Sequence, residues 1–310
     1  MSEILFTGLD GKNPLAFLAA LGVLNILADR CTTPPAPKIA WKNVGTYRPV
    51  LVDGPAPRDL LDILVEDLAS FADERALDLH YKKPGGADAH DLKPLPRRYA
   101  EYLEDLRDRA SRRSLAFAGA FATDVAVDNN GNTKPTALHF TAGQQEFLAM
   151  VTELQRGTNR EDFEEALFGP WRYARPLPVL QWDNAQSRDY ALRAGDPSKE
   201  KKLGVPGADW LAFRGLPFIR VVPEEDKIVT TGCRGGWKSG TFRWPIWNAS
   251  LGREVVQSVL ASSELFDLEP RVLRTRGVAV VFEASINRSD QGGYGSFSPA
   301  SVASRRQERL

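Results

Sequence analysis

The segment that constrains the fold most begins at Leu15, because it is apolar on nearly every face of a helix as far as Leu24. Asn13 followed by Pro14 is typical of an N-cap and a first helical residue. A helix that is apolar all round must be buried on all sides. The run is too short to cross a bilayer, which needs about 20 apolar residues, and it lacks the features of a signal peptide. We therefore expect a buried helix at the centre of a fold with no membrane contact.

The rest of the chain mixes helical and strand patterns. A chain of 310 residues fits one large or two modest domains. The pattern predicts an α+β fold, with a helix-richer N-terminal half around the buried first helix and a strand-richer C-terminal half. Regions 1–170 and 171–310 are the candidate domains. The alternative is that both regions belong to a single domain. Helices are expected at 57–72, 96–110, 141–154 and 160–168, and strands at 38–44, 47–52, 115–140 (a hairpin turning at 128–131), 218–222, 228–231 and 277–282.

The charge balance restricts where nucleic acid can bind. The chain has 40 basic and 40 acidic side chains, so any nucleic-acid surface must be local. Two cysteines, Cys31 and Cys233, are too few for a cysteine-rich zinc site, and a large cysteine-poor chain suits a reducing cytoplasm. No phosphate-binding or catalytic motif occurs. We therefore expect no metal, no cofactor and no catalytic residue, which favours a binding or assembly protein.

Two alternatives come from other functional classes. The first is a nuclease or RNA-processing enzyme that uses His80, His90 or His139; His90 and Asp91 form a His-Asp dipeptide, but a metal-dependent hydrolase of that kind needs further ligands. The second is a scaffold that contacts only protein subunits, with Trp237 and its neighbours as the core of an interface.

Residues 227–253 contain no acidic side chain, which is unusual in a chain that is 26% charged. Basic and aromatic residues alternate along this segment, and glycines surround the basic residues at its centre. Such a loop allows basic side chains to approach phosphates and an aromatic ring to stack on a base. The residues expected to bind nucleic acid are Arg234, Trp237, Lys238 and Arg243. A hairpin with core tryptophans and surface arginines is the simpler interpretation of the same pattern.

Three further basic clusters support a nucleic-acid surface. Each alone is also typical of a solvated face, and basic residues at a helix end favour the macrodipole. Together with residues 227–253 they predict a basic groove. Its second group of candidate residues is Lys82, Lys83, Arg112, Arg113, Lys201 and Lys202.

The opening segment resembles the N-terminal signature of CRISPR-associated proteins from type I-U/I-G systems, in a Cas-eight-like large-subunit family. The matching positions are Asn13, Pro14, Phe17, Ala19, Gly22 and Leu24, with Val23 where the family usually has Leu. Segments 181–193, 207–213 and 242–247 look like further blocks of the same kind of protein.

The resemblance implies a non-catalytic subunit of a Cascade-type, RNA-guided surveillance complex in the cytoplasm. Its partners would be guide RNA, target DNA, the other effector subunits and a recruited helicase-nuclease. In such complexes guide pairing supplies sequence specificity, and protein reads the short adjacent motif and the backbone. The chain is short for a large subunit, and its C-terminal third does not show the long amphipathic helices of a fused small subunit. A small-subunit function would then come from a separate polypeptide.

Overall fold

The structure is a computed structural model, and it describes residues 3–109, 111–141, 145–186, 203–225, 227–288 and 294–303. Its centre is helix α1 (Pro14–Arg30), which is buried from Pro14 to Leu27. The side chain of Asn13 accepts a hydrogen bond from the backbone N–H of Leu15 at 2.9 Å, as an N-cap does. The predicted buried helix is confirmed.

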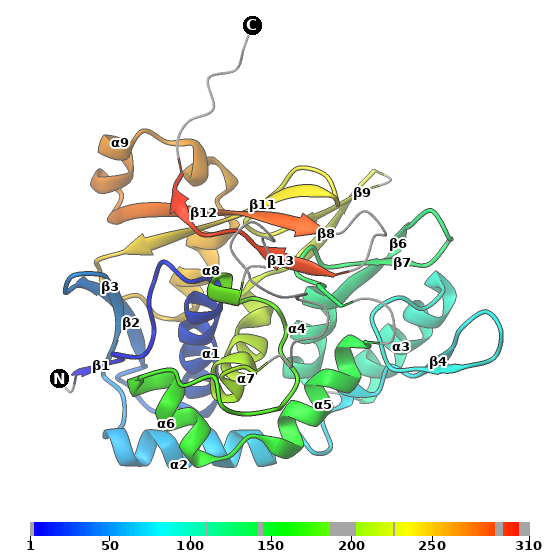
Figure 1. Cartoon of the computed structure of the whole chain (residues 1–310), viewed down its shortest axis with the longest axis horizontal. Coiled ribbons are helices and arrows are strands. Elements are labelled where there is room, and N and C mark those ends of the chain that lie inside the picture. The colour runs from blue at the N-terminus through cyan, green and yellow to red at the C-terminus, as the bar shows by residue number, and fades with distance from the viewer. Residues whose placement is uncertain are drawn as a thin grey trace, which may run out of the picture.

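Helix α7 (Pro206–Gly215) is the main neighbour of α1, and the two lie side by side at the centre of Figure 1. Glycines allow this approach. A Cβ on Gly22 would lie 1.8 Å from the carbonyl oxygen of Leu211, and a Cβ on Gly215 would lie 2.3 Å from that of Leu18. The two helices therefore meet backbone to backbone.

Two antiparallel sheets cover this helix pair. One is three-stranded, in the order β1-β3-β2, and the other extends the path β10-β11-β12-β13, with β14 pairing β12. The indole N–H groups of Trp244 and Trp247 join the second sheet to the first half of the chain, since they donate to the carbonyl oxygens of Gly11 and Ile39. The strands are β1 (Glu3–Leu5), β2 (Lys38–Asn43), β3 (Tyr47–Val52), β10 (Cys233–Arg234), β11 (Ser239–Trp247), β12 (Val278–Arg288), β13 (Gly295–Phe297) and β14 (Ser301–Val302).

Amphipathic helices and short hairpins complete the fold around this centre (Figure 1). The helices are α2 (Pro57–Ala69), α3 (Pro96–Arg109), α4 (Arg112–Phe121), α5 (Phe147–Gly157), α6 (Arg160–Phe168), α8 (Arg253–Ala261) and α9 (Pro270–Thr275), with 3-10 turns η1 (Arg75–Leu77), η2 (Asn184–Gln186), η4 (Leu216–Phe218) and η5 (Ser263–Asp267). The hairpins are β4 (Tyr81–Lys82) with β5 (Asp88–Ala89), β6 (Ala122–Val127) with β7 (Thr133–Pro135), and β8 (Val221–Glu224) with β9 (Lys227–Thr230).

The mixture of helices and sheets confirms the α+β class. The largest hydrophobic cluster draws side chains from Ile4 to Ala300, and thus from both regions that the sequence separated at residue 170. Among the described residues, no helix has both the length and the apolar character that a bilayer crossing requires.

Three expected elements differ from the structure. The strand expected at 218–222 begins at Val221, because Phe218 belongs to the 3-10 turn η4. Residues 115–121 belong to helix α4, not to a strand, because Ser111 caps the helix through the N–H of Ser114 and the alanines that follow are strong helix formers. The hairpin turn at Asp128–Gly131 is confirmed, with Gly131 at φ +78°. Helix α5 begins at Phe147 instead of Thr141. The hydroxyl of Thr141 contacts His139 and is no N-cap of α5.

Candidate nucleic-acid interface

Trp237 lies in the loop that joins β10 to β11, and 38% of its surface is exposed. Gly235 adopts φ +85°, a left-handed conformation that glycine accommodates without strain. Lys238 follows the tryptophan and is exposed. Among the described residues it has no ion-pair partner. The loop thus presents an aromatic ring and a free ammonium group together.

Arg288, at the end of β12, lies against the ring of Trp237. Its Cζ atom is 3.7 Å from the ring centroid, and its Nε donates to the carbonyl oxygen of Trp237 at 3.0 Å. The other guanidinium nitrogens donate to the carbonyl oxygens of His139 and Ala137 at 2.7 and 2.8 Å. Burial lowers the pKa of Arg288 to about 10, so the group stays charged at neutral pH. Neutral carbonyls hold it in place and leave its charge uncompensated.

Lys93 adds a further positive charge beside the same ring, with its Nζ atom 5.6 Å from the centroid. Burial lowers the pKa of Lys93, and the charge of Arg288 lowers it further, while Asp91 acts in the opposite direction. Within the part of the chain that the structure describes, neither Lys93 nor Arg288 forms an ion pair. We name Trp237, Lys238, Lys93 and Arg288 the Trp237 surface.

Two of the four residues first expected in this site have other partners. Arg234 forms an ion pair with Asp267 at 2.6 Å and donates to the carbonyl oxygen of Ser263. Arg243 is 7% exposed and lies between Glu283 and Asp267. Both arginines therefore hold η5 against the sheet. Arg243 in particular has no exposed guanidinium for a ligand, because its cross-strand partner Glu283 neutralises it.

The other aromatic side chains of the acid-free segment belong to the core. Phe242, Trp244 and Trp247 are each at most 1% exposed. Trp244 stacks on Phe242, and Trp247 lies edge-on to Trp41. They are unable to form the core of a subunit interface, so in the scaffold alternative only Trp237 itself is available for contact.

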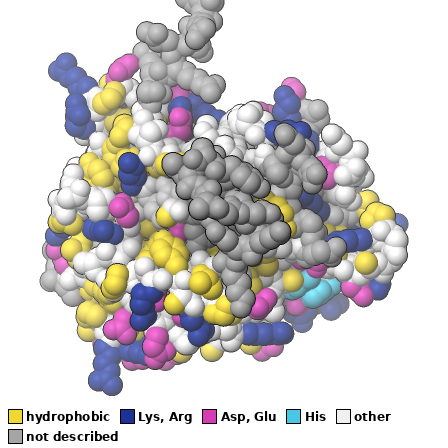
Figure 2. Space-filling view, in the orientation of Figure 1, with side chains coloured by type: hydrophobic (Ala, Val, Ile, Leu, Met, Phe, Trp, Pro, Cys, Tyr) yellow, Lys and Arg dark blue, Asp and Glu magenta, His cyan; other side chains and the backbone are white. Residues whose placement is uncertain are grey.

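Acidic neighbours pair with most of the weaker basic residues that the structure describes, and the basic groove stays a prediction. Lys82 and Lys83 form ion pairs with Asp88 and Glu146, each at 2.6 Å. Arg113 forms an ion pair with Glu74 at 2.6 Å and covers the ring of Phe71. Arg112 is exposed at the start of α4, and Lys201 and Lys202 lie outside the described residues. On the face in Figure 2, dark blue and magenta side chains are likewise interspersed.

The three histidines occupy two environments. The rings of His80 and His90 stack with centroids 4.1 Å apart, and Nε2 of His90 contacts the carbonyl oxygen of Leu77. His139 is buried, and burial lowers its pKa despite the neighbouring Asp91. Asp91 and Thr141 both contact Nε2 of His139. A hydrolytic triad needs the acid and the nucleophile on opposite ring nitrogens, so this cluster lacks that geometry.

The structure adds Lys93 and Arg288 to the site, and the sequence signal for them is weak. Lys93 follows Asp91 in a proline-rich segment, and Arg288 ends an apolar strand. The register of β11 with β12, in which Ser239 faces Asn287, brings Arg288 beside the loop. Because α8, η5 and α9 separate the two strands in the chain, no local pattern reveals that register.

Comparison with protein-family models and with curated proteins gives no match to this chain.

Proposed function

We propose that the chain is a non-catalytic nucleic-acid-binding subunit and that the Trp237 surface contacts a phosphate backbone and an unstacked base. The observation that carries this proposal is one exposed indole with the cations Lys93 and Arg288 over its ring and the exposed Lys238 next to it in the chain, none of which forms an ion pair within the described residues. Phosphate is the anion that such a group favours, and release of condensed counterions supplies the free energy of binding.

The indole gives this surface a second property. Arg288 covers part of the ring and fixes its orientation through the hydrogen bond to the Trp237 carbonyl oxygen. The exposed part of the ring is available for stacking on a base, which contributes about 1–3 kcal/mol per base. Stacking requires a base outside a duplex, so single strands and displaced strands are the expected ligands.

The resemblance of the opening segment to CRISPR-associated large subunits supports a more specific role. In that role the partners are guide RNA, target DNA, other effector subunits and a recruited helicase-nuclease. The Trp237 surface would then contact target DNA near the adjacent motif, where the duplex opens. A ligand that contains a guide heteroduplex and a displaced strand is therefore the most informative probe.

The test is a binding titration of the purified chain with labelled single-stranded DNA, single-stranded RNA, duplex DNA and an R-loop mimic. Fluorescence anisotropy at about 50 to 200 mM salt gives both the affinity and its salt dependence. The double variant Trp237→Ala/Lys238→Glu is expected to bind at least about tenfold more weakly, with a salt slope about one to two units shallower. Tighter binding of the R-loop mimic than of duplex DNA supports the subunit role.

The matched control is Arg271→Glu, which makes the same type of charge change at an exposed position on α9. Helix α9 packs on β12. It precedes the start of that strand at Val278, whereas Arg288 is the last residue of the strand. This variant is expected to bind like the wild type. Equal affinities of the double variant and the wild type, or no binding of any of the four probes, would overturn the proposal.

A further inference from the structure

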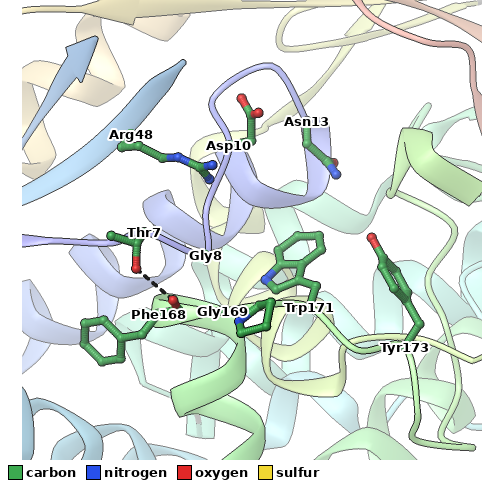
Figure 3. Close-up of a pocket in the computed structure, with 10 residues that line it drawn as sticks. Thr7, Gly8, Asp10, Asn13, Arg48, Phe168, Gly169, Trp171 and Tyr173 are labelled. Carbon is green, nitrogen blue, oxygen red and sulfur yellow. Dashed lines mark hydrogen bonds between the residues drawn. The ribbon is translucent and has the colours of Figure 1, made fainter. Parts of the chain in front are cut away.

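An open pocket of about 480 Å³ lies between the turn that precedes α1, strand β3 and the segment that follows α6. Figure 3 shows where its side chains lie: Arg48 and Asp10 at the upper edge, Trp171 below them, and Asn13 and Tyr173 to one side. Its volume lies within the roughly 300–1,000 Å³ of small-molecule sites. The pocket shares no lining residue with the Trp237 surface.

Backbone contacts fix the floor of the pocket. The N–H of Gly8 donates to the carbonyl oxygen of Leu167 at 2.8 Å, and the hydroxyl of Thr7 donates to that of Phe168 at 2.7 Å. A Cβ on Gly8 would lie 2.5 Å from the carbonyl oxygen of Ala166, so glycine is required for this close approach. The N-terminal turn is therefore attached to the end of α6, and the pocket is formed before a ligand arrives.

A buried carboxylate orients two of the polar side chains. Asp183 is 2% exposed, and its two oxygens accept hydrogen bonds from Asn13 Nδ2 at 2.8 Å and from the hydroxyl of Tyr173 at 2.9 Å. Burial and the charge of Asp183 raise the pKa of Tyr173, so its hydroxyl keeps its proton. The tyrosine oxygen and the second N–H of Asn13 remain available to a ligand.

Trp171 provides a flat apolar surface in this pocket. Its indole N–H donates to the carbonyl oxygen of Ala166 at 3.1 Å, and its ring is edge-on to that of Tyr173. The ring is half-buried and lines the cavity. Because its own polar group is satisfied inside the protein, its contribution to a ligand is the face of the ring.

Two charged groups in the pocket have unused binding capacity. The guanidinium of Arg48 has no hydrogen bond or ion pair with the residues that the structure describes. Asp10 accepts from the N–H of Lys12 and the hydroxyl of Thr46 through one oxygen, and its other oxygen has no partner among those residues. A ligand that satisfies both groups carries an anion for Arg48 and a hydrogen-bond donor for Asp10, and it can place a flat ring on Trp171, which lies below them.

We propose that this pocket binds one nucleotide whose base carries an exocyclic amino group. The base stacks on Trp171, its amino group donates to Asp10, and its phosphate accepts from Arg48. A bidentate arginine suits phosphate, and a carboxylate accepts from the exocyclic amino group of adenine, cytosine or guanine, whereas uracil has no such group and offers its ring N3–H alone. The ligand class rests on the proposed function, and the nucleotide is either free or part of a bound strand.

The test is calorimetry with AMP, CMP, UMP and adenosine, followed by the strand titrations described above. AMP and CMP are expected to bind more tightly than UMP. Arg48→Gln is expected to lower the affinity for AMP at least about tenfold and to leave the affinity for adenosine unchanged, because the variant loses the phosphate contact alone. Asp10→Asn is expected to reduce the preference for AMP over UMP. Arg271→Gln is the matched control, because it removes a positive charge at an exposed position on α9.

The outcomes separate this inference from the proposed function. Binding of free AMP with the stated loss in Arg48→Gln supports a free nucleotide. If AMP fails to bind up to about 1 mM but Arg48→Gln weakens strand binding, the nucleotide is part of a strand. If strands bind and neither Arg48→Gln nor Asp10→Asn changes any affinity, this inference is overturned and the Trp237 surface stands. Mononucleotide binding without strand binding overturns the proposed function alone.

Discussion

Helix α7 and the loop around Trp237 contain the same residue types in opposite environments. Each has a tryptophan, an arginine and glycines within a few positions. Trp210 is fully buried, whereas Trp237 is 38% exposed. Arg214 of α7 is also fully buried, while the cations of the Trp237 surface contact solvent. The composition of a segment therefore does not decide whether its arginines and tryptophans belong to the core or to a binding surface.

The partners of the charged groups make the difference. Arg214 donates to both oxygens of Asp67, at 2.7 and 3.0 Å, and its guanidinium lies 4.5 Å from the centroid of Phe71. A buried cation needs such a paired and hydrogen-bonded anion. Among the described residues, Arg288 donates to backbone carbonyls and lies against the rings of Trp237 and Phe140, without a carboxylate partner, and Lys238 has no ion-pair partner. Charge without a counter-charge among the described residues is what distinguishes the loop from α7 and supports the proposed site.

The largest expected effect is that of Gly22→Ala, because the added Cβ would lie 1.8 Å from the carbonyl oxygen of Leu211. The backbones of α1 and α7 would have to separate, and we expect a loss of about 4 kcal/mol in the free energy of unfolding. Urea denaturation measures it. The control is Gly119→Ala in α4, where nothing lies within 4 Å; alanine is expected to stabilise that helix by about 0.5 kcal/mol. Similar effects at the two positions would contradict the close helix contact.

The next effect concerns the buried arginine. Asp67→Ala leaves Arg214 with Asp29, at 3.6 Å, as its carboxylate partner among the described residues, and we expect a loss of about 3 kcal/mol in the free energy of unfolding. The matched control is the neighbouring Glu66→Ala, which removes the ion pair with Arg30; Glu66 is 67% exposed, so the loss should stay below about 1 kcal/mol. Thermal and urea unfolding of both variants measure the difference. Equal losses in the free energy of unfolding for the two variants would mean that the buried Arg214 does not need Asp67 as its counter-charge.

Sequence reasoning succeeded where the information was local. Asn13 and Pro14 predicted the start of α1, and the apolar residues after them predicted its burial. The burial of Arg214 depends on Asp67, which is 147 residues away, and no local pattern reveals it. The acid-free segment singled out Trp237, which is exposed, and the nucleic-acid contact that it predicts there stays a prediction. It was misleading for Arg234 and Arg243, because the acids that pair with them, Asp267 and Glu283, lie beyond its end.

The pocket at Asp10 and Arg48 shows the same limit. The sequence marked the first turn only as the beginning of a buried helix. Arg48, Trp171 and Asp183 reach that turn from three distant segments. Their arrangement depends on how β3 and the end of α6 pack against Gly8, which is a tertiary property.

The smallest expected effect distinguishes two adjacent glycines of the loop itself. Gly235 has φ +85°, and a Cβ there would lie 2.8 Å from the carbonyl oxygen of Ser239, so Gly235→Ala should cost about 1–2 kcal/mol. A Cβ on Gly236 would meet its nearest atom at 3.9 Å, and Gly236→Ala should change stability by less than about 0.5 kcal/mol. Urea unfolding compares them. Because Gly235 also sets the direction of the chain from β10 to Trp237, its alanine variant should bind single-stranded nucleic acid more weakly than the Gly236 variant.

In α7 the glycine at position 215 has no side chain, so that two backbones can touch, whereas in the loop Gly235 permits a turn that keeps an indole exposed. Equal stability and equal binding of the two variants would refute the second of these roles.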